Sequence, residues 1–99
     1  GVYRVFRVPP AKASQADVVW KDDIVSRQGI TAREGKSLGM TGDDRYVLIE
    51  GSEAGIARAT ELLKDIAKAL AGAEAETVYR RFRAQDEEAA SGMGLIFGP

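Results

Sequence analysis

One stretch decides the fold of this chain: RYVLIEGSEAGIARATELLKDIAKALA, residues 45–71. Residues 45–50 have a continuous apolar centre, which is typical of a strand in the interior of a sheet. Ser52 then stands at the N-cap position of a helix, where its hydroxyl can accept a bond from a free amide. Apolar residues recur after it at spacings of three and four and form one stripe: Ile56, Ala59, Leu63, Ile66 and Leu70. The stretch therefore predicts a strand followed by a helix that ends at Gly72.

Two elements are predicted before this stretch. Residues 2–8 mix β-branched and aromatic residues with arginines, as strands do, and Pro9 ends the run because proline cannot donate to a sheet ladder. Ser14 and Asp17 have the spacing of a capping box. They predict a helix that begins at Ser14 and stops at Gly29.

The chain after residue 72 is predicted to hold one more strand and an extension. Residues 76–84 are assigned to the last major strand, and residues 85–99 to a C-terminal extension. Leu95, Ile96 and Phe97 form a glycine-bounded apolar segment within that extension. Such a segment is expected to pack on its own sheet or on a neighbouring subunit, either of which it could extend by adding a strand at the edge, and it is then an oligomer contact.

Residues 30–38 leave two architectures open. An edge strand there gives an α+β domain of the ferredoxin-like split βαβ type, with the helices on one face of an antiparallel sheet. A short helix there, opened by Thr31 and Glu34, gives a βαβαβ two-layer domain instead. The first is favoured. The length of 99 residues predicts a single domain over residues 1–99.

The composition removes several classes of function. The chain has no cysteine and no histidine, which excludes Ser-His-Asp and Cys-His mechanisms and zinc–thiolate sites within one chain. No cofactor or metal site is therefore expected, and an enzymatic role is disfavoured. No apolar run approaches the length of a membrane helix and no signal peptide is visible, so a cytoplasmic protein without membrane contact is expected.

A candidate binding surface comes from the outer strands of the predicted sheet. Strand alternation places Arg7, Tyr79, Arg81 and Arg83 on one face, where arginines and an aromatic ring would offer a stacking platform for bases. The net charge of −1, from 14 basic and 15 acidic residues, gives no support to nucleic-acid binding. A solvated or dimer-facing surface is therefore preferred.

The function expected from the sequence is a non-enzymatic, homo-oligomeric module that binds a small ligand or a partner protein. Binding of RNA or single-stranded DNA through the arginine–aromatic strands is the alternative. A third and weaker alternative is a carboxylate-dependent enzyme whose site is completed between subunits. It would use Asp22, Asp43 or Asp44.

Overall fold

The computed structural model describes the backbone of residues 1–97 and the side chains of residues 1–87. Four strands form an open antiparallel sheet in the order β2-β3-β1-β4. Three α-helices accompany the sheet, so the predicted α+β class is confirmed. The strands are β1 (Val2–Val8), β2 (Gly29–Glu34), β3 (Arg45–Gly51) and β4 (Lys68–Ala69), and the helices are α1 (Val18–Lys21), α2 (Glu53–Leu63) and α3 (Gly72–Phe97).

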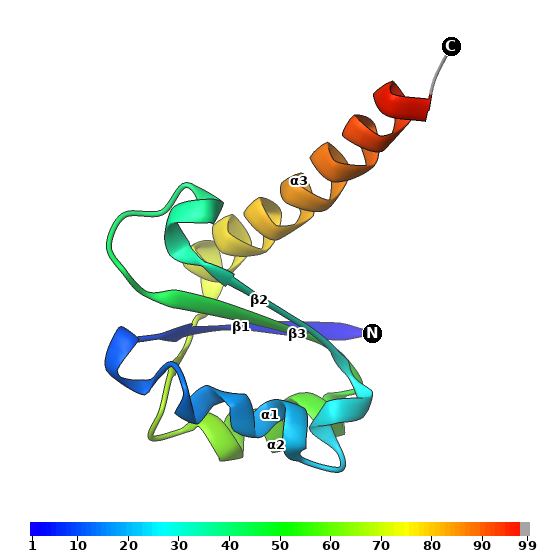
Figure 1. Cartoon of the computed structure of the whole chain (residues 1–99). Helices are drawn as coiled ribbons and strands as arrows, with labels where there is room; N and C mark the ends of the chain where they lie inside the picture. The colour runs from blue at the N-terminus through cyan, green and yellow to red at the C-terminus, as the bar shows by residue number, and fades with distance from the viewer. Residues whose placement is uncertain (98–99) are drawn as a thin grey trace.

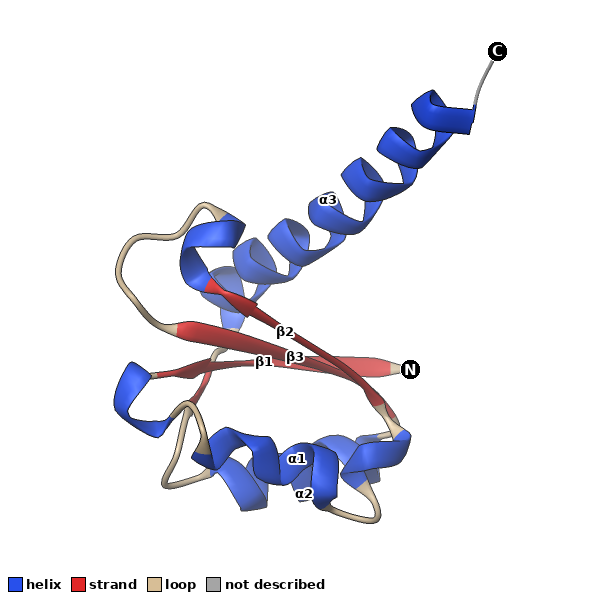
Figure 2. Ribbon diagram, in the orientation of Figure 1, coloured by secondary structure: helices blue, strands red, loops and turns tan. Residues whose placement is uncertain are grey.

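The helices cover both faces of the sheet. Figure 1 shows α1 and α2 on one side of the strands and α3 on the other, and Figure 2 shows the sheet as the middle of three layers. The prediction that the helices share one face was therefore wrong. The error comes from residues 76–84, which form part of α3 on the opposite face instead of a strand.

Each face of the sheet has its own core. Alternation along β3 sends Val47 and Ile49 to the side of α2, where Leu63 and other residues bury them. The same alternation sends Tyr46 and Leu48 to the opposite face. This central strand is buried on both faces, which explains why its sequence is a continuous apolar run.

The helix after β3 begins as predicted and ends early. Ser52 Oγ accepts a hydrogen bond from Gly55 N at 3.0 Å, so the N-cap is confirmed. The predicted extent to residue 71 was wrong, because α2 ends at Leu63 and residues 68–69 form β4. Leu70 N donates instead to Val5 O at 2.9 Å. The Leu70 side chain joins the core on the face opposite α2.

The predicted strand over residues 76–84 was also wrong. These residues belong to α3, which packs its inner face on the sheet through Ala75, Val78 and Phe82. Their spacings of three and four are those of one helix face. The helix closes the face of the sheet that would otherwise be open.

The predicted helix over residues 14–28 is broken into short pieces. A four-residue α1 is flanked by 3₁₀ turns at Gln15–Asp17 and Val25–Arg27, and Ser14 makes no side-chain cap. Asp22 is the physical reason for the break. Its backbone is extended, and its carboxylate accepts bonds from the amides of Ile24 and Val25, each at 3.1 Å. A short acidic side chain that binds nearby amides competes with helix formation.

The ambiguous segment over residues 30–38 is a strand in its first half. β2 occupies Gly29–Glu34, and a 3₁₀ turn follows at Gly35–Leu38. Gly39 ends that turn with φ of 75°, a conformation that glycine adopts without steric cost. Across the described residues, no helix has the length and apolar character needed to cross a bilayer.

Candidate functional site

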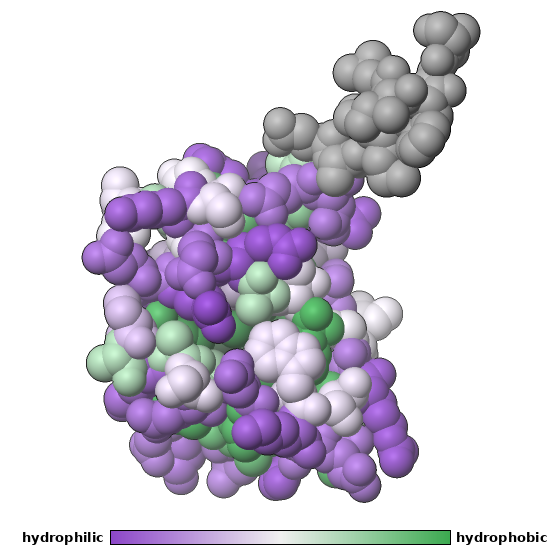
Figure 3. Space-filling view, in the orientation of Figure 1, coloured by the Kyte–Doolittle hydropathy of each residue, from purple (hydrophilic) through white to green (hydrophobic). Residues whose placement is uncertain are grey.

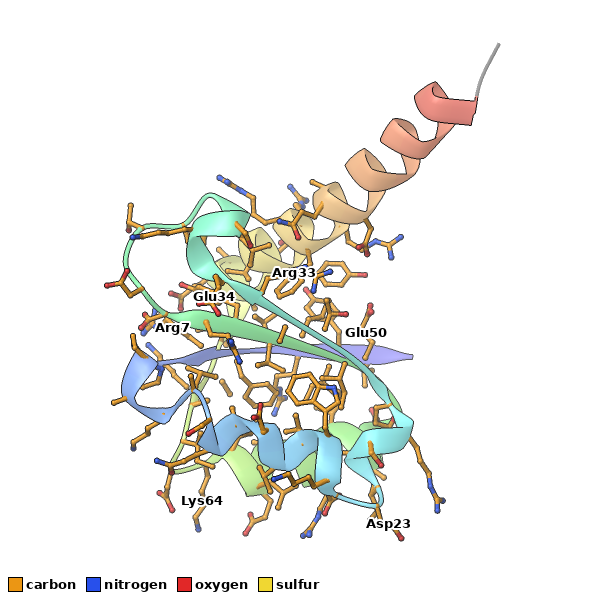
Figure 4. The ribbon with its side chains drawn as sticks, in the orientation of Figure 1. Arg7, Asp23, Arg33, Glu34, Glu50 and Lys64 are labelled. Carbon is orange, nitrogen blue, oxygen red and sulfur yellow. The ribbon has the colours of Figure 1, made fainter. Side chains whose placement is uncertain are left out.

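A cleft of about 610 Å³ opens at the end of β1. Its wall is built from four parts of the chain: the end of β1, the turn after it, the residue before β3, and the connection from α2 to β4. Figure 4 shows Arg7 and Lys64 on the same side of the molecule. The cleft brings together four basic and two acidic residues: Arg7, Lys12, Lys64, Lys68, Asp44 and Asp65.

Two of the cations stand next to each other on paired strands. Arg7 lies directly opposite Lys68 in the register of β1 and β4. Like charges in such a pair repel. Arg7 is partly neutralised, since its guanidinium lies 3.7 Å from Asp44 Oδ2 and 3.1 Å from Glu74 Oε2. Lys68 has no ion-pair partner among the described side chains.

The remaining lysines differ in how they are held. Lys12 Nζ donates to the backbone oxygen of Asp65 at 2.7 Å, which fixes the turn after β1 to the connection that follows α2. Lys64 follows the last residue of α2 and, like Lys68, makes no ion pair within the described part of the chain. Two ammonium groups in this cleft therefore keep their full capacity to donate to a ligand.

Ammonium and guanidinium groups recognise phosphate and carboxylate oxygens through charge-assisted hydrogen bonds. The cleft volume falls within the range of small-molecule sites. The side chains in the cleft offer charge and hydrogen bonds. The arrangement is suited to holding an anion.

The predicted arginine–aromatic surface is not assembled. Arg7 lies on β1, whereas Tyr79, Arg81 and Arg83 lie on α3. The Tyr79 ring stacks on Tyr3 with centroids 4.0 Å apart, which occupies one face of the aromatic side chain. Arg81 donates to Leu38 O at 3.1 Å, and Arg83 is exposed.

Of the three acidic residues considered for metal-assisted chemistry, Asp22 lies apart from Asp43 and Asp44, which line one hollow together with Glu34. Asp22 pairs with Arg58 at 2.9 Å, Asp43 pairs with Lys36 at 3.2 Å, and Asp44 faces the cleft. Within the residues that the structure describes, no group of three or more acidic side chains is arranged to hold a metal ion. Each acid is accounted for by a local contact.

The predicted oligomer contact lies at the end of α3. The backbone of Leu95, Ile96 and Phe97 continues this helix, so the alternative in which the segment adds a strand was wrong. The side chains of these three residues lie outside the described set.

No protein-family model, curated protein or solved structure matches the chain. The lysines of the cleft were missed at the level of sequence. In the sequence, Lys64 and Lys68 have one notable property, which is their position toward the end of the predicted helix. Lysine there is ordinarily explained by attraction to the negative end of the helix dipole.

Proposed function

We propose that this chain is a non-enzymatic module that binds a small anionic ligand in the basic cleft. The observation that carries the proposal is the gathering of four cationic side chains around one cleft that holds only two carboxylates. Lys64 and Lys68 donate to the ligand, while Arg7 and Lys12 hold the walls through their own contacts. The missing histidine and cysteine support binding rather than turnover.

A small ligand fits the arrangement better than a nucleic acid. The stacking platform required an open sheet face with arginines from two strands, and α3 covers that face. Arg83 lies nine residues beyond Glu74 on α3, about 13 Å along the helix axis from the salt bridge that holds Arg7. The cations of the cleft therefore do not continue into a longer basic track through Arg83.

We also infer a ferredoxin-like split βαβ arrangement for residues 1–69. Its support is the strand order β2-β3-β1-β4, in which each helical connection joins two strands that have a third strand between them. The single-domain assignment, the homo-oligomeric state and the cytoplasmic location stay predictions.

The cleft is tested by titrating ¹⁵N-labelled protein with inorganic phosphate, pyrophosphate and citrate, and following amide chemical shifts. The variant is the double substitution Lys64→Ala, Lys68→Ala. Its matched control is Lys21→Ala, Arg27→Ala, which removes two exposed cations outside the cleft. Both variants change the net charge equally, so a general field effect alters them alike.

We expect the amides of residues 64–68 to shift with at least one probe, and the shifts to weaken as salt is added. The cleft variant should bind at least about tenfold more weakly, since each charge-assisted bond is worth about 1.5–3 kcal/mol. The control should bind as the wild type does. Absence of any shift up to roughly 10 mM probe, or equal losses in the two variants, refutes the proposal.

A further inference from the structure

The outer edge of β2 is unpaired in the described part of the chain. β2 is the first strand in the sheet order, and only β3 lies beside it. Leu70 N donates to Val5 O, so the amide and carbonyl of Val5 point toward β4. In antiparallel strands, the backbone groups of successive residues point alternately to one neighbouring strand and to the other. The registers of β1 with β3 and of β3 with β2 extend this alternation across the sheet. As a result, the amides and carbonyls of Ile30, Ala32 and Glu34 point away from β3.

Apolar side chains are exposed on the helix layer next to this edge. Trp20 is 44% exposed and Ile24 is 50% exposed. They belong to α1 and to the turn that follows it, and Figure 1 shows α1 under β2. In Figure 3, apolar and weakly polar surface gathers at the middle of this face, between the strands and the helices. Exposed aromatic and aliphatic side chains are enriched at protein interfaces.

α3 leads toward the same edge on the other face of the sheet. Near its start, Glu74 pairs with Arg7 on β1. Three turns later, Gln85 Oε1 accepts a bond from Arg33 Nε on β2 at 3.1 Å, and these two strands have β3 between them. Residues 86–97 continue the helix beyond Gln85 for about 18 Å, and Figure 1 shows these turns leaving the sheet.

We propose that a second copy of the chain pairs with β2 along this edge. The two strands run antiparallel about a two-fold axis, so two four-stranded sheets become one sheet of eight strands. The contact is self-complementary, since the same outward amides and carbonyls serve both copies. In the isolated chain, Arg33 Nη1 donates to the outward oxygen of Ala32 at 2.8 Å. Pairing exchanges this bond for one from the partner's amide.

A second copy of the chain fits this edge better than a short peptide strand, because a stable interface must bury more area than the edge alone provides. A specific interface buries about 800 Å² on each partner. An edge of six residues is about 20 Å long and about 10 Å thick, which gives roughly 200 Å². A peptide strand would cover this edge alone, whereas a second copy also brings its α1 and α3 to the two helix layers.

Ala32→Pro tests the edge without breaking the chain's own sheet. The Ala32 amide points outward, so proline removes no bond to β3, yet its ring blocks an approaching strand. Ile24→Glu tests the apolar layer on the α1 side. Val2→Glu is the matched control, because Val2 is 40% exposed and lies on β1, two strands away from β2.

Sedimentation velocity over a range of concentrations gives the readout, with far-UV circular dichroism to verify folding. We expect a wild-type dimer that becomes monomeric in Ala32→Pro and Ile24→Glu and persists in Val2→Glu. A wild-type monomer at roughly 100 μM, a dimer that survives both edge substitutions, or a dimer equally lost in Val2→Glu overturns the proposal. The anion cleft is independent of this edge, so the Lys64→Ala, Lys68→Ala variant should remain dimeric.

Discussion

Phe82→Ala should lower the free energy of unfolding by about 3–5 kcal/mol, the usual cost of emptying a buried phenylalanine site. Phe82 is only 3% exposed on the inner face of α3, and it belongs to the same core as Val5 and Leu48 of the sheet. Domains are commonly stable by about 5–15 kcal/mol, so this variant keeps little reserve. Val78→Ala removes two methyl groups at a fully buried position and should cost about 2 kcal/mol, which leaves a measurable transition.

The assay is urea unfolding followed by far-UV circular dichroism. With a denaturant slope of about 1–1.5 kcal/mol/M, the Phe82→Ala midpoint should fall by roughly 2–5 M. Arg83→Ala is the control, because Arg83 is exposed one position away and should change stability by less than about 0.5 kcal/mol. If Phe82→Ala and Arg83→Ala cost the same, α3 does not pack on the sheet and the second core is refuted.

Three further predictions follow from individual contacts. Ser52→Ala should lower the free energy of unfolding by about 1 kcal/mol, because the Gly55 amide loses its cap; an unchanged urea midpoint would contradict this. The hydrogen bond from Arg58, together with backbone amides, lowers the pKa of Asp22 below its ordinary 3.8. The contact therefore stabilises the fold above about pH 4, and this stabilisation is lost as the pH falls through the folded-state pKa. The stability difference between wild type and Asp22→Asn, measured by urea unfolding, should therefore shrink from pH 7 to pH 3, and a difference independent of pH would refute the assignment. Deleting residues 93–99 should weaken self-association in sedimentation, while the urea midpoint measured at concentrations where the chain is monomeric stays constant. An unaltered dimer would show that the end of α3 lies outside the interface.

The strand β3 and the start of α2 were predictable because local signals and tertiary contacts agree there. The end of α2 was not, since the apolar spacing continues from Leu63 through Ile66 to Leu70. Leu70 leaves the stripe because the edge of β1 offers its amide a partner, the oxygen of Val5. A partner 65 positions away in the chain has no trace in the local spacing.

The error over residues 76–84 has a different origin. Val78 and Phe82 are four positions apart, and that spacing puts two side chains on one face of a strand and also on one face of a helix. Ala75 distinguishes the two, because its distance of three from Val78 fits only the helix. Aromatic and β-branched residues favoured the strand, but such preferences depend on packing context.

The cleft could not be predicted, because its charges come from segments that only the fold brings together. It holds four of the 14 basic residues and two of the 15 acidic residues. Ten basic and 13 acidic residues remain elsewhere, so the rest of the chain has a net charge of −3 while the cleft has +2. The total of −1 averages these two regions and hides the local excess. Exposed charges are screened beyond about 8 Å at physiological ionic strength. A bound anion would therefore experience the charges of the cleft, together with Glu74 beside Arg7, far more than the other acids of the chain.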